Sequence, residues 1–134
     1  MEKRREYFRR HVRRALIAAA FAGGAQACEL PPGARVESRR VALSYRTIPA
    51  KIGVGEPFVL ELAACPKTGA ALSGRVKLDA QMPEHRHGMN YRPSVKPMGG
   101  GRYRSEGWLF HMPGRWEFVF DLDGERLTHS VRVE

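Results

Sequence analysis

Apolar and polar residues alternate with a period of two along most of the chain after residue 40. In the clearest stretch, 116–122, every second residue is aromatic or leucine. Because successive side chains of a strand point to opposite faces, this alternation is typical of a half-buried strand. Similar stretches predict six strands, at 41–46, 58–63, 75–82, 102–110, 116–122 and 127–133. A short seventh strand at 91–96 would be confined to a sheet edge by Pro93.

Turn residues separate these strands. Glycine and proline punctuate 53–57, 66–69 and 99–101, and Asp123-Gly124 is a good type I′ hairpin turn. The strand at 58–63 is apolar on both faces and is expected in the middle of a sheet. The pattern predicts an all-β protein, an immunoglobulin-like antiparallel β-sandwich of six or seven strands. This domain would span 40–134, after an irregular lead-in at 28–39.

The first 27 residues have the composition of a cleavable signal peptide. Seven basic residues precede a small apolar run at 15–22, and 25–27 fit the A-x-A cleavage pattern. The apolar run is shorter than the roughly 20 residues that span a bilayer. We therefore expect a periplasmic or secreted protein with no transmembrane anchor after cleavage. The pair Arg13-Arg14 leaves twin-arginine export open beside the general route.

Much of the net charge of +9 comes from the predicted signal peptide. Removing residues 1–27 leaves 16 basic and 12 acidic residues, so the charge is not interpreted as a nucleic-acid-binding surface. Catalytic motifs are also missing from the sequence: it contains no G-x-S-x-G, no H-E-x-x-H and no P-loop. We expect no nucleic-acid partner and no enzyme activity, unless a bound metal itself performs chemistry.

The two cysteines, Cys28 and Cys65, would meet an oxidising compartment after export. A disulfide between them is the simplest expectation. A competing possibility is a lipoprotein anchored through Cys28, although Ala25 and Gln26 make a poor lipidation signal. Thiolate metal ligands come third, because neither cysteine lies in a C-x-x-C spacing.

The segment 82–89 contains two histidines and two methionines in eight residues. If it is extended, His85, His87 and Met89 share one face. Imidazole suits copper, zinc and nickel, and a thioether adds a preference for Cu(I). Met82 and Met112 each precede proline and are favoured as core residues, because a Met-Pro step can bury the methionine at a strand end.

A second histidine-methionine pair, His111-Met112, lies in the turn 111–114. If the sandwich brings this turn beside 82–89, the two segments form one copper site; if not, only a weak surface site is left. On the competing interpretation, the histidines decorate an exposed loop whose charged residues form salt bridges. His129 is expected to be a packed histidine. The candidate metal ligands are His85, His87, Met89, His111 and Met112.

Three groups of residues carry a resemblance to a known family: Met82-Pro83 with His85 and His87-Gly88-Met89, then Gly101 with Tyr103, then Phe110 with Met112-Pro113-Gly114 and Trp116. In this combination the chain, from about 45 to 133, resembles the YtkA-like domain family, which includes FixH-type proteins. The resemblance implies a small extracytoplasmic β-sandwich, and some members are associated with oxidase assembly or copper handling. FixH-like members usually keep a membrane anchor, which is not expected here.

The chain is more weakly similar to periplasmic copper chaperones of the PCuAC type, and this similarity informs ligand chemistry only. In this comparison Met98 would be an accessory contact. The expected function is an exported copper carrier or an accessory factor for a cuproprotein or an oxidase-assembly partner. The alternative is a metal-free interaction module of the cell envelope whose histidine-methionine loop is structural. The sequence leaves the oligomeric state open.

Overall fold

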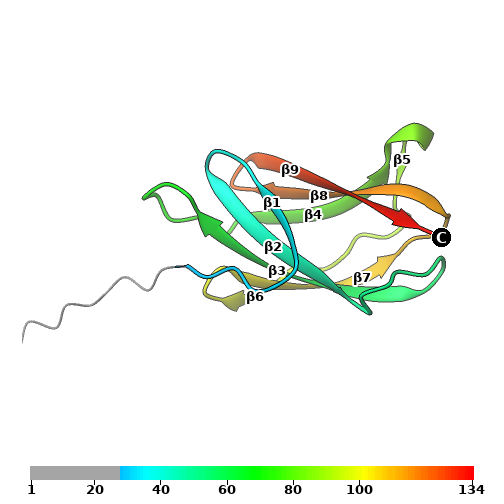
Figure 1. The fold of residues 1–134 in the computed structure, drawn as a ribbon, viewed down its shortest axis with the longest axis horizontal. Coiled ribbons are helices and arrows are strands. Elements are labelled where there is room, and N and C mark those ends of the chain that lie inside the picture. The colour runs from blue at the N-terminus through cyan, green and yellow to red at the C-terminus, as the bar shows by residue number, and fades with distance from the viewer. Residues whose placement is uncertain (1–27) are drawn as a thin grey trace, which may run out of the picture.

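The computed structural model describes residues 28–134; the predicted signal peptide, 1–27, lies outside the described residues. Within the described part, nine strands form two antiparallel sheets that face each other (Figure 1). The five-stranded sheet has the order β1 (Ala34–Glu37), β2 (Val41–Ile48), β3 (Pro57–Pro66), β7 (Arg102–Leu109), β6 (Lys96–Gly99). The four-stranded sheet has the order β5 (His87–Gly88), β4 (Val76–Met82), β8 (Gly114–Leu122), β9 (Glu125–Val133). The predicted antiparallel sandwich is confirmed.

Two short strands account for the difference between the six or seven predicted strands and those described. β1 lies inside the segment 28–39 that we expected to be irregular, and β5 has two residues. Neither is long enough for a period-two pattern to stand out, because pairing with β2 and β4 defines them. The predicted edge strand at 91–96 lies a few residues later, as β6, and it contains Pro97.

The core fills the space between the two sheets. β3 is the central strand of its sheet, as its apolar sequence predicts, and it places Phe58, Leu60 and Leu62 in the interior. β8 contributes Trp116, Phe118 and Phe120 from the opposite sheet, and all three are fully buried. Phe118 packs edge to face against three rings of the five-stranded sheet, those of Tyr45, Phe58 and Trp108.

The hairpin between β8 and β9 forms at Asp123-Gly124, where both residues have positive φ, 52° and 80°. This is the geometry that the type I′ prediction requires. The Asp123 carboxylate accepts hydrogen bonds from the backbone N–H and the hydroxyl of Ser73. These bonds hold the pKa of Asp123 below its usual value.

The predicted disulfide is confirmed: Cys28 and Cys65 are bonded, with Cα atoms 5.7 Å apart. Cys65 alternates with the core residues of β3, so it lies on the outer face of the five-stranded sheet. The disulfide therefore ties the segment before β1 to that outer face. A sulfur in a disulfide cannot also carry a lipid, so the disulfide and a lipidated Cys28 exclude each other.

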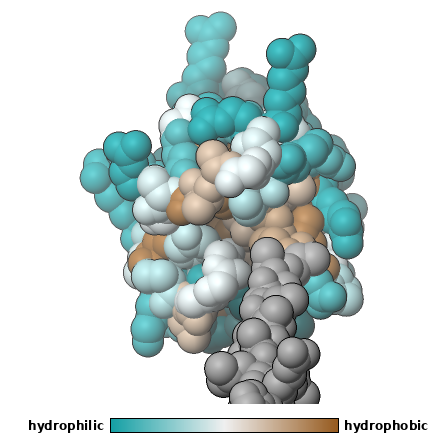
Figure 2. Space-filling model, turned by 90° about the vertical axis from the view of Figure 1, so that its left-hand side faces the viewer, coloured by the Kyte–Doolittle hydropathy of each residue, from teal (hydrophilic) through white to brown (hydrophobic). Residues whose placement is uncertain are grey.

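Figure 2 shows the end of the sandwich that lies on the left-hand side of Figure 1. Hydrophilic side chains surround smaller areas of apolar surface at this end (Figure 2). The charged side chains that line the sheets thus leave part of the apolar surface open, as is common in folded proteins.

Candidate functional site

The histidine-methionine segment turns sharply instead of continuing as an extended strand. After β4 ends at Met82, Pro83–His85 forms a single 3-10 turn, η1, for which proline at the first position is well suited. Arg86 then adopts the left-handed conformation, with φ 55° and ψ 38°. The chain reverses here, so that His87 pairs with Met82 in the register of β4 and β5. The extended arrangement that we considered for 82–89 is therefore wrong.

The turn nevertheless keeps the two histidines of this segment close together. The ring centroids of His85 and His87 are 5.7 Å apart. His85 is exposed, whereas His87 is half-buried at the edge of the four-stranded sheet. Nδ1 of His87 lies 3.1 Å from the carbonyl oxygen of Gly88. Because a carbonyl can only accept, this contact places the proton on Nδ1 and leaves Nε2 as the free acceptor.

His111 reaches the same place from a different part of the chain. It lies between β7 and β8, in the link that carries the chain from one sheet to the other at the end where β5 lies (Figure 1). The ring centroids of His87 and His111 are 5.3 Å apart. The structure thus brings together three imidazoles, with His87 in the middle; we call His85, His87 and His111 the imidazole cluster.

Trp116 forms the floor of the imidazole cluster. Its ring lies 6.0 Å from that of His87 and 5.5 Å from that of His111, edge to face in both cases. Trp116 is itself fully buried and is stacked at 4.3 Å on Phe110. Its indole Nε1 donates to the carbonyl oxygen of Met112 at 2.9 Å. The floor is therefore fixed by core packing, and it also holds the backbone of the turn after His111.

One nitrogen of the imidazole cluster has no partner. Nδ1 of His111 is buried and makes no hydrogen bond within residues 28–134. A buried polar atom without a partner is costly and calls for an explanation, such as a water or an ion. This nitrogen is thus an available ligand atom at the inner side of the cluster.

Unlike the three histidines of the cluster, the methionines do not lie together at the surface. Met82 is fully buried between the sheets, as expected for a core residue. Met89 and Met112 are half-buried and pack against the same core. Met98, on β6, is 56% exposed and lines a cavity on the five-stranded sheet. The sequence thus groups histidines and methionines that the fold separates: the imidazoles meet at the surface, and three of the methionines lie in or against the core.

An ion pair connects the turn Pro83–His85 to β8 on the surface of the protein. The guanidinium of Arg115 donates to the Glu84 carboxylate at 2.6 Å and to the Ser130 hydroxyl at 3.0 Å. The bond from Arg115 lowers the pKa of Glu84. Salt bridges of the charged residues in this loop belong to the competing interpretation of the sequence, which named no partner for them; Arg115 is 31 residues away from Glu84.

The imidazoles do not converge fully. Among residues 28–134, no group of three His, Cys, Asp or Glu side chains is placed to hold a single ion as the rings now stand. The ligand assignment of His85, His87, His111, Met89 and Met112 therefore stays a prediction. His129 lies apart from the imidazole cluster, and a 2.6 Å hydrogen bond joins its Nδ1 to the hydroxyl of Tyr45, as in a packed histidine.

No protein-family model, curated protein or solved structure matches this chain. Among the described residues, no helix has the length and apolar character needed to cross a membrane.

Proposed function

We propose that the protein is an exported copper-binding carrier or accessory factor for a cuproprotein, of the YtkA-like type. The observation that carries the proposal is the imidazole cluster, in which His87 lies within 5.7 Å of His85 and 5.3 Å of His111, ring centroid to ring centroid. Two imidazoles bound to one tetrahedral ion have centroids about 5 Å apart, given metal–nitrogen bonds of about 2 Å. Small side-chain rotations would therefore direct the nitrogens to a common point.

Two nitrogens support this arrangement. Nε2 of His87 is free because Nδ1 is engaged with a backbone carbonyl, a contact that commonly orients metal-binding histidines. Nδ1 of His111 is buried and has no partner within the part of the chain that the structure describes, and a bound ion would satisfy it. His85 is exposed and would complete the cluster from the solvent side.

The ligand types favour copper. Imidazole binds Cu, Zn and Ni, and the thioethers of Met89 and Met112 would add a preference for Cu(I). These two side chains pack against the core, so their participation requires that they turn toward the cluster. A site that is partly exposed and incompletely assembled suits a carrier, which must release its ion to a partner.

The Cys28–Cys65 disulfide supports export, because such bonds persist mainly in oxidising compartments. A periplasmic or secreted location is part of the proposal. Its alternative, a lipoprotein anchored at Cys28, would require that this disulfide does not form. The relation to the YtkA-like family and a cuproprotein or oxidase-assembly partner belong to the same proposal.

A second candidate function is a metal-free docking surface for another envelope protein. It is favoured by the ion pair between Glu84 and Arg115, which stiffens the turn without a metal. An exposed turn with fixed charges at its tip would suit a protein partner. In this case the imidazole cluster would be a structural feature of the turn.

Copper titration of the mature protein against a competing chelator distinguishes the two candidates. Stoichiometric binding of Cu(I) or Cu(II) that is lost in the double variant His85→Ala with His87→Ala would support the carrier. The matched control, His129→Gln, removes an imidazole outside the cluster and should bind as the parent does. Lack of binding by the parent, or equal binding by the double variant, would overturn the copper proposal.

A further inference from the structure

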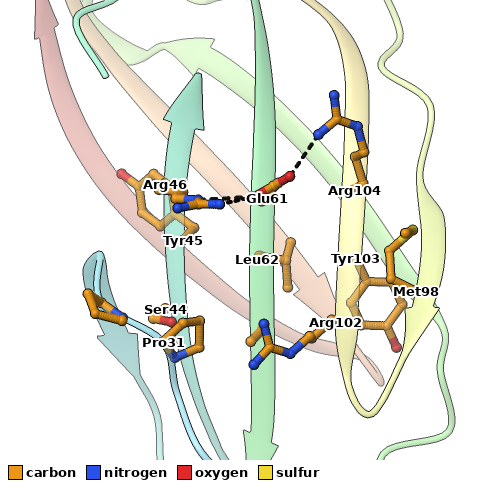
Figure 3. Close-up of a pocket in the computed structure, with 12 residues that line it drawn as sticks. Pro31, Ser44, Tyr45, Arg46, Glu61, Leu62, Met98, Arg102, Tyr103 and Arg104 are labelled. Carbon is orange, nitrogen blue, oxygen red and sulfur yellow. Dashed lines mark hydrogen bonds and ion pairs between the residues drawn. The ribbon is translucent and has the colours of Figure 1, made fainter. Parts of the chain in front are cut away.

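A second feature of the molecule lies away from the imidazole cluster and shares no residue with it. The outer face of the five-stranded sheet carries a cavity of about 400 Å³, within the range of ligand pockets, over β2, β3 and β7. Figure 3 shows this cavity with Pro31 on one side and Met98 on the other. The disulfide at Cys28 ties the chain that contains Pro31 to the sheet. One wall of the cavity is thus covalently fixed to the floor.

The strand register arranges the floor of the cavity in two rows. In one row, Arg46 and Arg104 both donate to the Glu61 carboxylate between them, at 2.7 Å each. In the other row, two residues along each strand, Ser44 pairs with Ala63 and Ala63 pairs with Arg102. Residues two apart in a strand share a face, so both rows point outward.

The second row places a hydroxyl and a guanidinium on either side of a small residue, Ala63, which is itself only 3% exposed. Ala63 has no side chain beyond Cβ, so nothing of its own fills the space between Ser44 and Arg102, whose strands are separated by β3. In Figure 3, Arg102 extends from β7 over β3 toward the side of Ser44, whereas Arg46 and Arg104 turn toward Glu61. Neighbouring strands lie about 4.8 Å apart, so the two backbones are separated by about 10 Å.

Ser44 is the unusual member of this row. It is 1% exposed although it lies on the outer face of the sheet, and its Oγ makes no hydrogen bond to any residue in 28–134. Serine hydroxyls that are buried normally find a partner in the backbone or in bound water. Ser44 is one of the residues that line the cavity, although its Oγ is covered in the free protein. A ligand that reached this hydroxyl would supply the missing partner.

The charges around the cavity favour an anion. Its lining has three arginines and one carboxylate, and Glu61 is shared by two of the arginines. Arg102 makes no ion pair within the described part of the chain and is exposed, so its guanidinium is free to bind. A single free guanidinium matches the geometry and charge of a carboxylate, which it can bind through two parallel hydrogen bonds.

We propose that this cavity binds a small organic acid. The carboxylate would lie over Ala63, between the Arg102 guanidinium and the Ser44 hydroxyl. An apolar body would lie along the walls formed by Pro31 and the thioether of Met98, which is 56% exposed. Such a ligand would satisfy the buried hydroxyl and cover an exposed apolar side chain at the same time.

Titration of the ¹⁵N-labelled protein with 3-phenylpropionate, followed by amide chemical shifts, tests this proposal. We expect saturable shifts at the amides of Ser44, Ala63 and Arg102. The neutral 3-phenylpropanamide has the same shape without the charge and should bind at least tenfold more weakly. Arg102→Gln should weaken binding of the acid at least tenfold, while Arg39→Gln, which removes an exposed arginine outside the cavity, should leave it unchanged.

Ser44→Ala separates a ligand-binding role from a structural one. Because the hydroxyl has no partner among the described residues, its removal should leave the melting temperature unchanged or raise it, while binding of the acid weakens several-fold. Absent or unsaturable shifts, equal binding of the amide, or tighter binding of inorganic phosphate than of the acid would each overturn the proposal. A lower melting temperature with unchanged binding would overturn the role of Ser44. The copper titration is independent of all these outcomes.

Discussion

The chain contains two Met-Pro steps beside histidines, and the sandwich uses them in different ways. The side chain of Met82 is fully buried between the sheets, where it approaches Gly114. Met112 is half-buried, and its backbone carbonyl accepts the hydrogen bond of Trp116. The first step thus contributes a side chain to the core, and the second contributes a backbone group that holds the floor of the imidazole cluster. The same dipeptide has a role that depends on which of its groups the fold buries.

The largest effect on stability should come from truncating the buried methionine. Met82→Ala leaves a cavity between the sheets and should lower the free energy of unfolding by about 2–5 kcal/mol. Met112→Ala removes a half-buried side chain and keeps the carbonyl that Trp116 uses, so it should cost about 1 kcal/mol. Chemical denaturation of the two variants measures this difference. Equal losses would mean that the two steps do not differ as described.

A smaller loss of stability is expected at Gly114, which follows the second Met-Pro step and lies close to the side chain of Met82. A methyl group at Gly114 would lie 2.9 Å from Cε of Met82, at a φ of 127° that side chains rarely adopt. Gly114→Ala should therefore lower the free energy of unfolding by about 1–3 kcal/mol. The cost should fall in the Met82→Ala background, which removes the contact. Gly69→Ala is the control, because open space surrounds Gly69 and no cost is expected. Additive effects of the first two changes would contradict the contact.

Substitutions of the histidines and of Met112 should change copper affinity in different ways. His87 lies between the other two imidazoles, so His87→Ala should weaken binding at least about tenfold, or about 1.4 kcal/mol. His85→Ala removes one outer, exposed ring and should cost less. Met112→Ala should affect Cu(I) more than Cu(II), because a thioether prefers the softer ion. Competition titrations measure each affinity. A larger loss for His85→Ala than for His87→Ala would contradict the central position of His87.

The smallest effect on stability is expected from the ion pair between Glu84 and Arg115. The hydrogen bond from Arg115 lowers the pKa of Glu84, so this pair stabilises the folded state above the unfolded pKa of about 4.5 and loses that contribution as pH falls through the lower folded pKa. The difference in stability between the parent and Glu84→Gln should therefore be small at pH 7 and vanish at strongly acidic pH. Because both side chains are exposed, the difference should also shrink in high salt. Denaturation curves at several pH values measure it, and a difference that grows toward low pH would contradict the pairing.

Local pattern was sufficient to predict most of the sandwich. Strands such as β3 and β8 are long and strongly patterned, and the turn at Asp123-Gly124 depends on residues that are adjacent in sequence. β1 and β5 were missed because they are too short to show a period and form through pairing with a neighbour. The turn at Pro83–His85 was missed because an alternating sequence does not reveal where a strand stops.

The candidate site was predicted less completely. The residue types in 82–89 and at His111 identified the chemistry, but their distance along the chain left their proximity undetermined. Trp116 belongs to the apolar face of the strand predicted at 116–122, and its second role as the floor of the imidazole cluster depends on which turn covers it. The row of Ser44, Ala63 and Arg102 gave no sequence signal, because it arises from the register of three strands.

The amino-acid sequence by itself determined the antiparallel strands and the hairpin turn, since these follow from alternation and turn residues. It made the pairing of the two cysteines the simplest expectation without excluding the alternatives. Only the tertiary structure decided that His111 lies beside His87, that Met82 is fully buried while Met112 is half-buried, and that Met112 supplies a carbonyl to Trp116. The reason is physical. Side-chain alternation is a property of neighbouring residues, whereas the juxtaposition of two loops depends on how two sheets pack around a shared core.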